Sequence, residues 1–359
     1  MRCKFNIVIL IGSVGLSLLF LSCENLFTRN SETEPGPRSY VWEIDTLHNT
    51  AMNYIHAIWG ASPDDIWVVG AGGTYSDRLL HYDGNEWTTY TDVPIFCFAD
   101  AIFGFAADHI WMGGSAGFTE DPGASIWHYD GNEWSANYIH DIGPGADIND
   151  IWGNSPDDIY ACGHFNHESV DNNWGGFVLH YDGDAWTELV RTKYRAHNPT
   201  EFMEVKGEKD HVYVWDFRTS RDGTGIDTVA FHELKGNQLH EIYAEARSNI
   251  GGNIGWGGFH LIDEKLYFYL GFDVFLYRSG KFVKQFSLDH PNYWGLSGGR
   301  NEKDVFLGMD DGLAHYNGTD IEYLFRYPWK GAYRIMGRPM IFEKEVFFCM
   351  EGSAGGFWN

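Results

Sequence analysis

Short runs of alternating apolar and polar residues fill most of the chain, and they recur as one repeating unit. Each clear copy reads Ile-Trp-Gly-x-Ser-Pro-Asp-Asp-Ile-Trp, followed by Leu-His-Tyr-Asp-Gly-x-x-Trp, or a close variant of both. The clearest copies comprise residues 58–67 with 80–87, 102–111 with 127–134, and 151–160 with 179–186. Weaker copies comprise residues 205–213 with 231–232, 259–267 with 276–277, 297–306 with 314–318, and 345–347 with 356–358. Self-similarity at a regular spacing indicates a repeat architecture.

The spacing inside the unit predicts four short antiparallel strands. An aromatic residue recurs eight positions on, as from Trp59 to Trp67 and from Trp152 to Tyr160, which fits two strands joined by the Ser-Pro-Asp-Asp turn. The Leu-His-Tyr segment is then a third strand, and Asp-Gly makes a tight turn into a fourth. Units of four strands in about 40–50 residues are typical of β-propeller blades, whereas a solenoid of β-arcs, the main alternative, has shorter repeats.

The two ends of the sequence predict how such a ring closes. The last copy reaches the third-strand position at residues 356–358, while residues 40–47 alternate like a fourth strand ahead of the first copy. We therefore predict an all-β protein, a seven-bladed β-propeller over residues 39–359, in which this N-terminal strand completes the last blade. Closure removes the exposed strand edges that invite aggregation.

The repeating unit resembles that of bacterial secreted propeller lipoproteins, which carry labels such as sialidase-like or glucosyltransferase-like. The resemblance covers residues 39–359 and implies the propeller fold. It implies little about function, because the motif residues are the scaffold. Their Trp and Tyr side chains are expected to pack between blades, the Asp residues to form turns, and the His residues to lie on third strands.

The N-terminus predicts export and a lipid anchor. Arg2 and Lys4 precede an apolar run over residues 5–21, and Ser22-Cys23 follows. We interpret residues 1–22 as a lipoprotein signal peptide, Cys23 as the lipid attachment site, and residues 23–38 as the lipidated Cys with its flexible tether. An uncleaved anchor and a plain signal peptide are the alternatives. The predicted location is the bacterial cell envelope, as an outer-membrane lipoprotein that is periplasmic or surface-exposed.

Net charge limits the classes of partner that the chain can bind, and cysteine spacing bears on whether it forms disulfides. The formal net charge of -25 argues against nucleic acid and against anionic membrane surfaces, so we expect membrane contact through the lipid only. Cys97, Cys162 and Cys349 have no Cys-x-x-Cys spacing and are odd in number, which argues against a disulfide framework. Cys162 and Cys349 occupy matching strand positions, which favours small buried side chains there. We expect a monomer without a cofactor or a bound metal.

Unequal loops predict where a ligand site lies. Ligands of propellers meet the face made by the links from second to third strands and from fourth to first strands. The second-to-third links are long in the second, third and fourth units (residues 115–125, 164–176 and 216–227) and short in the next two. The candidate ligand-binding residues on this face are His164, His167, Trp174, Arg191, Lys193, Tyr194, Arg195, His197, Arg218 and Arg221.

The residues of these loops fit two chemistries. The basic run from Arg191 to Arg195 suggests a carboxylate or sulfate of a glycan, with Trp174 or Tyr194 stacked on a sugar ring. His164 and His167 with the acidic residues that follow them, Glu168 and Asp171, form the alternative metal-ligand set, which we do not favour.

The favoured function is a binding or interaction scaffold for a glycan, peptide or protein ligand, and the alternative is a glycan-active hydrolase or lyase on the same face. An enzyme would gather paired carboxylates near the centre of the ring. The expected starts of the first strands, Ile58, Ile102 and Ile151, are apolar, which favours binding. No catalytic residue is assigned.

Overall fold

The computed structural model describes residues 7–14, 34–47, 52–72, 79–90, 98–115, 123–142, 145–167, 173–192, 200–218, 227–250, 257–263, 265–326 and 333–352. The described secondary structure is all β except for one turn of 3-10 helix, η1 (Arg247–Asn249). In this part of the chain no helix is long and apolar enough to cross a membrane.

The strands follow the repeating unit. The first three units contain β3 (Met52–Ser62), β4 (Asp65–Gly72), β5 (Leu79–Tyr82) and β6 (Trp87–Thr89); β7 (Phe98–Ala106), β8 (His109–Ser115), β9 (Ala124–Tyr129) and β10 (Trp134–His140); and β11 (Asp147–Ser155), β12 (Asp158–His167), β13 (Asn173–Tyr181) and β14 (Trp186–Arg191). The next three contain β15 (Thr200–Glu208), β16 (His211–Arg218), β17 (Thr228–Lys235) and β18 (Gln238–Ala246); β19 (Gly257–Ile262), β20 (Lys265–Leu270), β21 (Asp273–Arg278) and β22 (Lys281–Ser287); and β23 (Tyr293–Asn301), β24 (Asp304–Met309), β25 (Gly312–Tyr316) and β26 (Ile321–Arg326). The last strands are β27 (Tyr333–Ile341) and β28 (Glu345–Gly352), which join β1 (Ile7–Val14) and β2 (Tyr40–Leu47).

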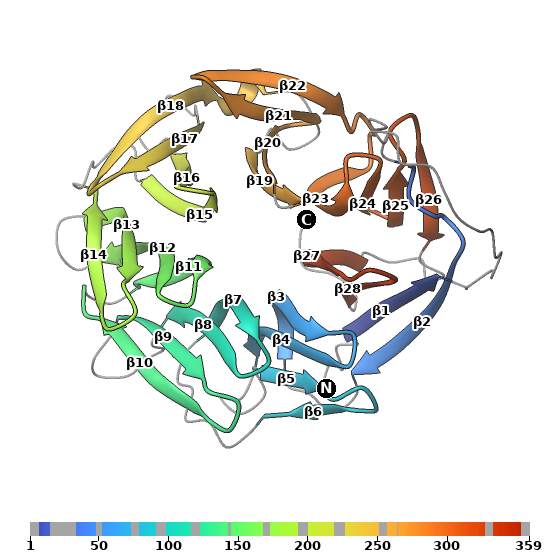
Figure 1. Ribbon diagram of the computed structural model, residues 1–359, viewed down its shortest axis with the longest axis horizontal. Coiled ribbons are helices and arrows are strands. Elements are labelled where there is room, and N and C mark those ends of the chain that lie inside the picture. The colour runs from blue at the N-terminus through green and yellow to red at the C-terminus, as the bar shows by residue number, and fades with distance from the viewer. Residues whose placement is uncertain are drawn as a thin grey trace, which may run out of the picture.

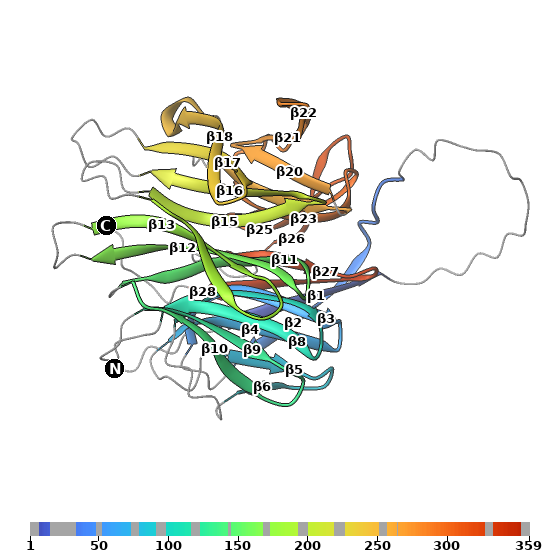
Figure 2. The ribbon, with the colours of Figure 1, turned by 60° about the vertical axis from the view of Figure 1, so that its left-hand side comes forward.

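These strands form a propeller-like ring of antiparallel sheets (Figure 1). Among the described residues, five sheets have four strands, and one sheet has eight. The eight-stranded sheet consists of two four-stranded runs, β19–β22 and β23–β26, joined by a single parallel pairing between Ile262 and Gly299. Figure 2 shows neighbouring sheets, such as β11–β14 and β15–β18, as adjacent layers.

The sheet that joins the two ends of the chain has the order β2-β1-β28-β27. The N-terminal strand β2 therefore lies in the sheet of the last repeat, where the sequence predicted residues 40–47 to lie. The third-strand position is held by β1, which pairs along its length with β28 and β2. Residues 356–358, predicted for that position, lie outside the described residues. Because β1 lies within the predicted signal peptide, its place in this sheet depends on whether residues 1–22 are removed.

The Asp-Gly turns between third and fourth strands account for one part of the motif. Asp83 Oδ1 accepts hydrogen bonds from the backbone N–H groups of Glu86 and Asn85, each at 2.9 Å. These bonds lower the pKa of the Asp83 carboxyl. Gly84 has a φ of +88°, in the left-handed region that glycine adopts without strain.

The tryptophans of the motif pack between units, as the sequence predicted. Trp67 on β4 meets Trp134 of the next unit edge to face, with ring centroids 5.6 Å apart. Trp111 meets Trp186 in the same way one unit further on, also at 5.6 Å. Such aromatic contacts add stability beyond the apolar area that they bury. Each unit therefore needs its neighbour to complete its core.

The Asp and His of the motif form a contact between second and third strands. His81 Nε2 lies 2.7 Å from Asp65 Oδ1. Equivalent pairs are His180 with Asp158 and His315 with Asp304, both at 2.8 Å. In the β15–β18 unit the two partners are exchanged, because His211 Nδ1 lies 2.8 Å from Glu233 Oε1. An exchange that keeps the contact shows that this pair serves the scaffold.

The cysteine prediction is confirmed where the structure describes it. Cys162 and Cys349 are buried free thiols, and burial raises the pKa of both. Cys97 lies outside the described residues.

Candidate functional site

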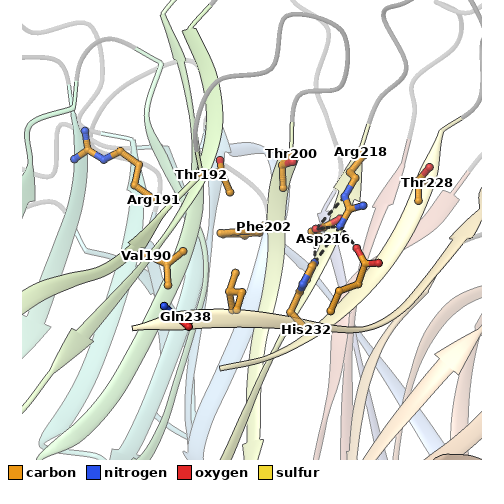
Figure 3. A pocket seen from close by; sticks show the side chains of 12 residues that line it. Val190, Arg191, Thr192, Thr200, Phe202, Asp216, Arg218, Thr228, His232 and Gln238 are labelled. Carbon is orange, nitrogen blue, oxygen red and sulfur yellow. Dashed lines mark hydrogen bonds and ion pairs between the residues drawn. The ribbon is translucent and has the colours of Figure 1, made fainter. Parts of the chain in front are cut away.

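A pocket of about 650 Å³ lies between the end of β14 and the strands β15–β18 (Figure 3). At Thr200, Arg218 and Thr228 it reaches the edge of the ring where second strands lead to third strands and fourth strands lead to first strands, which is the face that the sequence predicted for a ligand. Its other end, at Gln238 and Leu239, lies beside the turn from β17 to β18. Its volume falls in the range of small-molecule sites, about 300–1,000 Å³. The lining residues are Val190, Arg191, Thr192, Thr200, Phe202, Asp216, Arg218, Thr228, His232, Gln238, Leu239 and Glu241.

A network of charged side chains forms one side of this pocket (Figure 3). Asp216 is 1% exposed, and its Oδ2 lies 2.6 Å from His232 Nε2 and 3.0 Å from Arg218 Nη2. Arg218 Nη2 also donates to Glu241 Oε2 at 2.8 Å. Burial would lower the pKa of Arg218, but the carboxylates of Asp216 and Glu241 outweigh it and raise that pKa. The guanidinium is therefore charged and held by two acids.

The repeat itself shows that this network is a departure from the scaffold. His232 pairs with Val214, and Asp216 lies two residues after Val214 on the same face of β16. The corresponding positions in the first unit are Gly70 and Leu80, and those in the third unit are Gly163 and Leu179. A small residue and an apolar one are thus replaced by a buried acid and a base. Burying such a pair costs desolvation free energy that a Gly-Leu pair does not.

The structure places two of the predicted ligand residues in this pocket, Arg191 and Arg218. Arg191 is not an unpaired cation, because its guanidinium bonds both carboxylate oxygens of Glu188, with the closest contact at 2.6 Å. His164 lies outside the pocket lining and bonds Asn149 Oδ1 through its Nδ1 at 3.2 Å.

The other predicted ligand residues fall outside the residues or side chains that the structure describes. The structure describes the backbone of His167 on β12 and of Trp174 on β13, but not their side chains. Lys193, Tyr194, Arg195, His197 and Arg221 lie outside the described residues altogether, as do the alternative metal ligands Glu168 and Asp171. In the described part of the chain no group of three or more His, Cys, Asp or Glu side chains is arranged to hold a metal ion.

Sequence reasoning missed Asp216, His232 and Glu241. Asp216 and His232 fall on strand positions that are small or apolar in other units, so the available signal was their departure from the repeat. Comparing Asp216 and His232 with the other units requires the strand register, because the sequence of the fourth unit matches the motif only weakly.

A second cluster of titratable groups lies on the innermost strands. β3, β7 and β11 each carry a bulge near their start, at His56, Asp100 and Asn149. Bulges re-aim side chains and are frequent near functional sites. His56 Nδ1 contacts Asp100 Oδ1, and the carboxyl of Asp100 is hydrogen-bonded to that of Asp147. Burial and the Asp100 charge raise the pKa of Asp147 well above its usual range.

This cluster corrects an expectation about the first strands. They start at Met52, Phe98 and Asp147, several residues before the expected apolar starts. The bulges interrupt the alternation of apolar and polar residues, so the sequence did not predict that the segment before each bulge belongs to the strand. The two carboxyls are in direct hydrogen-bonding contact, whereas glycoside hydrolases hold theirs about 5–9.5 Å apart. Their geometry fits a shared proton rather than glycoside hydrolysis.

One contact crosses the middle of the ring. Three residues of β27, from Gly337 to Pro339, bulge out between the pairings of Met336 and Met340 with β28. The central one, Arg338, forms an ion pair with Glu204 on β15 and donates to the carbonyl of Phe259 on β19. The last repeat is thereby tied to units on the far side of the ring.

Comparisons with solved structures find distant likenesses. No protein-family model matches the chain, and neither does any curated protein. A Dyadobacter fermentans protein of unknown function has 11% identity and a TM-score of 0.45, covering 84% of this chain and 96% of its own. A Bacteroides uniformis protein provisionally assigned as a 6-phosphogluconolactonase has 12% identity and a TM-score of 0.45, covering 89% and 95%. A calcium-binding regucalcin from Agrobacterium tumefaciens has 11% identity and a TM-score of 0.39, covering 81% and 78%.

Proposed function

We propose that this chain is a cell-envelope lipoprotein, a seven-bladed β-propeller whose pocket between β14 and β15–β18 binds a small polar ligand. In this proposal the two runs of the eight-stranded sheet are two blades, and the lipid is carried by Cys23. The observation that supports binding is the Asp216–His232 pair, which lines a pocket at the expected face and replaces scaffold residues of the repeat.

Restoring the scaffold residues tests the pocket. The variant Asp216→Gly with His232→Leu has the residues that fold in the first and third units, so we expect it to keep the native circular dichroism spectrum. Binding to ligands found on a glycan array should fall at least tenfold, because the polar wall of the pocket is gone. The full-length protein in mild detergent is the sample.

A matched control separates binding from scaffold damage. Asp158→Asn removes the carboxylate from the Asp158–His180 pair, which has the same kind of contact at 2.8 Å outside the pocket lining. We expect unchanged ligand binding for this variant. Equal loss of binding in both variants, or none in the double variant, contradicts the proposed pocket.

The anchor has its own test. Radiolabelled palmitate should enter the wild-type protein and the Cys3→Ala control, but not the Cys23→Ala variant. Label that persists without Cys23 contradicts the lipid assignment while leaving the pocket untouched.

Catalysis is the second candidate, because Asp216 and His232 are an acid and a base within hydrogen-bonding distance at a pocket wall. Glycans that bind should then be cleaved, with new reducing ends or unsaturated products in wild type and none in Asp216→Asn. Glycan binding without any cleavage product would favour the binding function over catalysis.

A further inference from the structure

Among the described residues, both arginines that line the pocket have their charge compensated within the protein. Arg191 is bound to Glu188, and Arg218 is shared between Asp216 and Glu241. Two guanidinium groups therefore meet three carboxylates. An anionic ligand group would have to displace one of these carboxylates or approach it at close range, and like charges in close contact repel.

The remaining polar groups of the lining suit a hydroxylated ligand. Thr200, Thr228 and Gln238 bring two hydroxyls and an amide, which both donate and accept hydrogen bonds. Val190 and Leu239 add apolar surface of the kind that the C–H face of a sugar ring covers. Such a mixture of a few polar groups with apolar lining is typical of sites that bind neutral small molecules.

Two buried atoms of the network still lack partners. Among the described residues no hydrogen-bond donor reaches Asp216 Oδ1, and His232 Nδ1 has no partner either. A carboxylate oxygen only accepts, so it needs a donor to offset its burial. A ligand hydroxyl that reached this buried oxygen would supply such a donor, and a carboxylate or sulfate group would not.

We infer that the ligand of this pocket is a neutral, hydroxyl-rich molecule, a glycan residue without acidic groups, and that Glu188 and Glu241 select against acidic sugars. This inference rests on the proposed binding function. It reverses the expectation that the arginines of these loops hold a carboxylate or sulfate. The pocket volume of about 650 Å³ accommodates a short oligosaccharide segment.

Calorimetric titration of the full-length protein tests the selection. The probes are neutral trisaccharides of glucose, mannose, xylose and galactose, together with trigalacturonate, which differs from galactotriose by its carboxylates. We expect at least one neutral trisaccharide to bind at least tenfold more tightly than trigalacturonate. The Glu241→Gln variant releases Arg218 from one of its two carboxylates, so the affinity for trigalacturonate should rise about three- to tenfold.

The control carries the same change of charge elsewhere. Glu322 is 61% exposed and forms an ion pair with Arg38, outside the pocket lining. Glu322→Gln should leave all affinities unchanged. If wild type prefers trigalacturonate, or if Glu241→Gln gains nothing for it, the ligand class is wrong while the binding pocket stands. If none of the sugars binds, both this inference and the proposed function fail.

Discussion

The contact that crosses the ring gives the sharpest stability prediction. Arg338→Met keeps much of the aliphatic stem and removes the guanidinium that bonds Glu204 and the carbonyl of Phe259. Glu204 would then keep one described donor, the backbone N–H of Phe259 at 3.0 Å from its Oε2. The variant therefore leaves a partly buried carboxylate without its counter-charge.

The magnitude follows from how deeply the pair is buried. Removing one partner of a fully buried pair costs about 3–5 kcal/mol. Here the side chain of Arg338 is 32% exposed and that of Glu204 is 17% exposed, so water solvates part of the remaining charge. We expect a loss of about 2 kcal/mol in the free energy of unfolding for Arg338→Met. A double-mutant cycle with Glu204→Gln should give a coupling of about 1–2 kcal/mol.

Urea unfolding measures both values, with tryptophan fluorescence and far-ultraviolet circular dichroism required to give coincident transitions. The control is Arg278→Met, whose partner is Glu208 at 2.9 Å and whose side chain is 46% exposed. An exposed pair of this kind contributes about 1 kcal/mol or less. A coupling below about 0.5 kcal/mol for Arg338 and Glu204, or an equal loss in the Arg278 variant, refutes the argument.

Three further outcomes are expected. The raised pKa of Asp147 in the folded state means that this group costs stability as pH rises above its unfolded value of about 3.9, so Asp147→Asn should raise the melting temperature at pH 8 and lose that advantage toward pH 3. Burial and the neighbouring His109 lower the pKa of His128, so stability is lost as pH falls below about 6.5, and His128→Gln should flatten the melting curve against pH between about 5 and 7. A chain processed before Cys23 lacks β1 and should melt several degrees lower than the unprocessed chain; equal melting temperatures would show that another segment fills that place in the sheet.

The strand order of each unit was predictable because the motif combines local turn chemistry with a fixed spacing. Ser-Pro-Asp-Asp and Asp-Gly mark two turns, and the alternating aromatics mark the strands between them. The starts of the innermost strands were not predictable, because the extra residue of each bulge shifts the alternation by one position. The pairing of β1 with β28 was not predicted, for a different reason. An apolar run that follows basic residues has the pattern of a signal peptide, and this pattern does not show whether the same run can also pair as a strand.

Loop lengths favoured the face that one end of the pocket reaches, and Arg191 and Arg218 were among the residues predicted for it. Their ionic partners were not, since sequence shows charges but not which of them meet. Glu188 lies three residues before Arg191, and Glu241 reaches Arg218 from β18 of the same unit, 23 residues further along the chain. The positive charges of Arg191 and Arg218 are therefore compensated by acids that the sequence did not connect to them.

In a repeat protein, the other units show which residues a given strand position needs for folding. A buried polar pair in one unit can therefore be compared with the residues at the same positions in the others. Gly163 and Leu179 show that the unit folds without an acid and a base at the positions of Asp216 and His232. Burying those two polar side chains is consequently not a requirement of the fold. The scaffold pairs behave differently, because His211 and Glu233 exchange acid and base yet keep their contact. Where the repeat exchanges partners, the contact serves the ring. Where an ionic network at a pocket wall replaces a Gly-Leu pair, the proposed ligand would give that network a role.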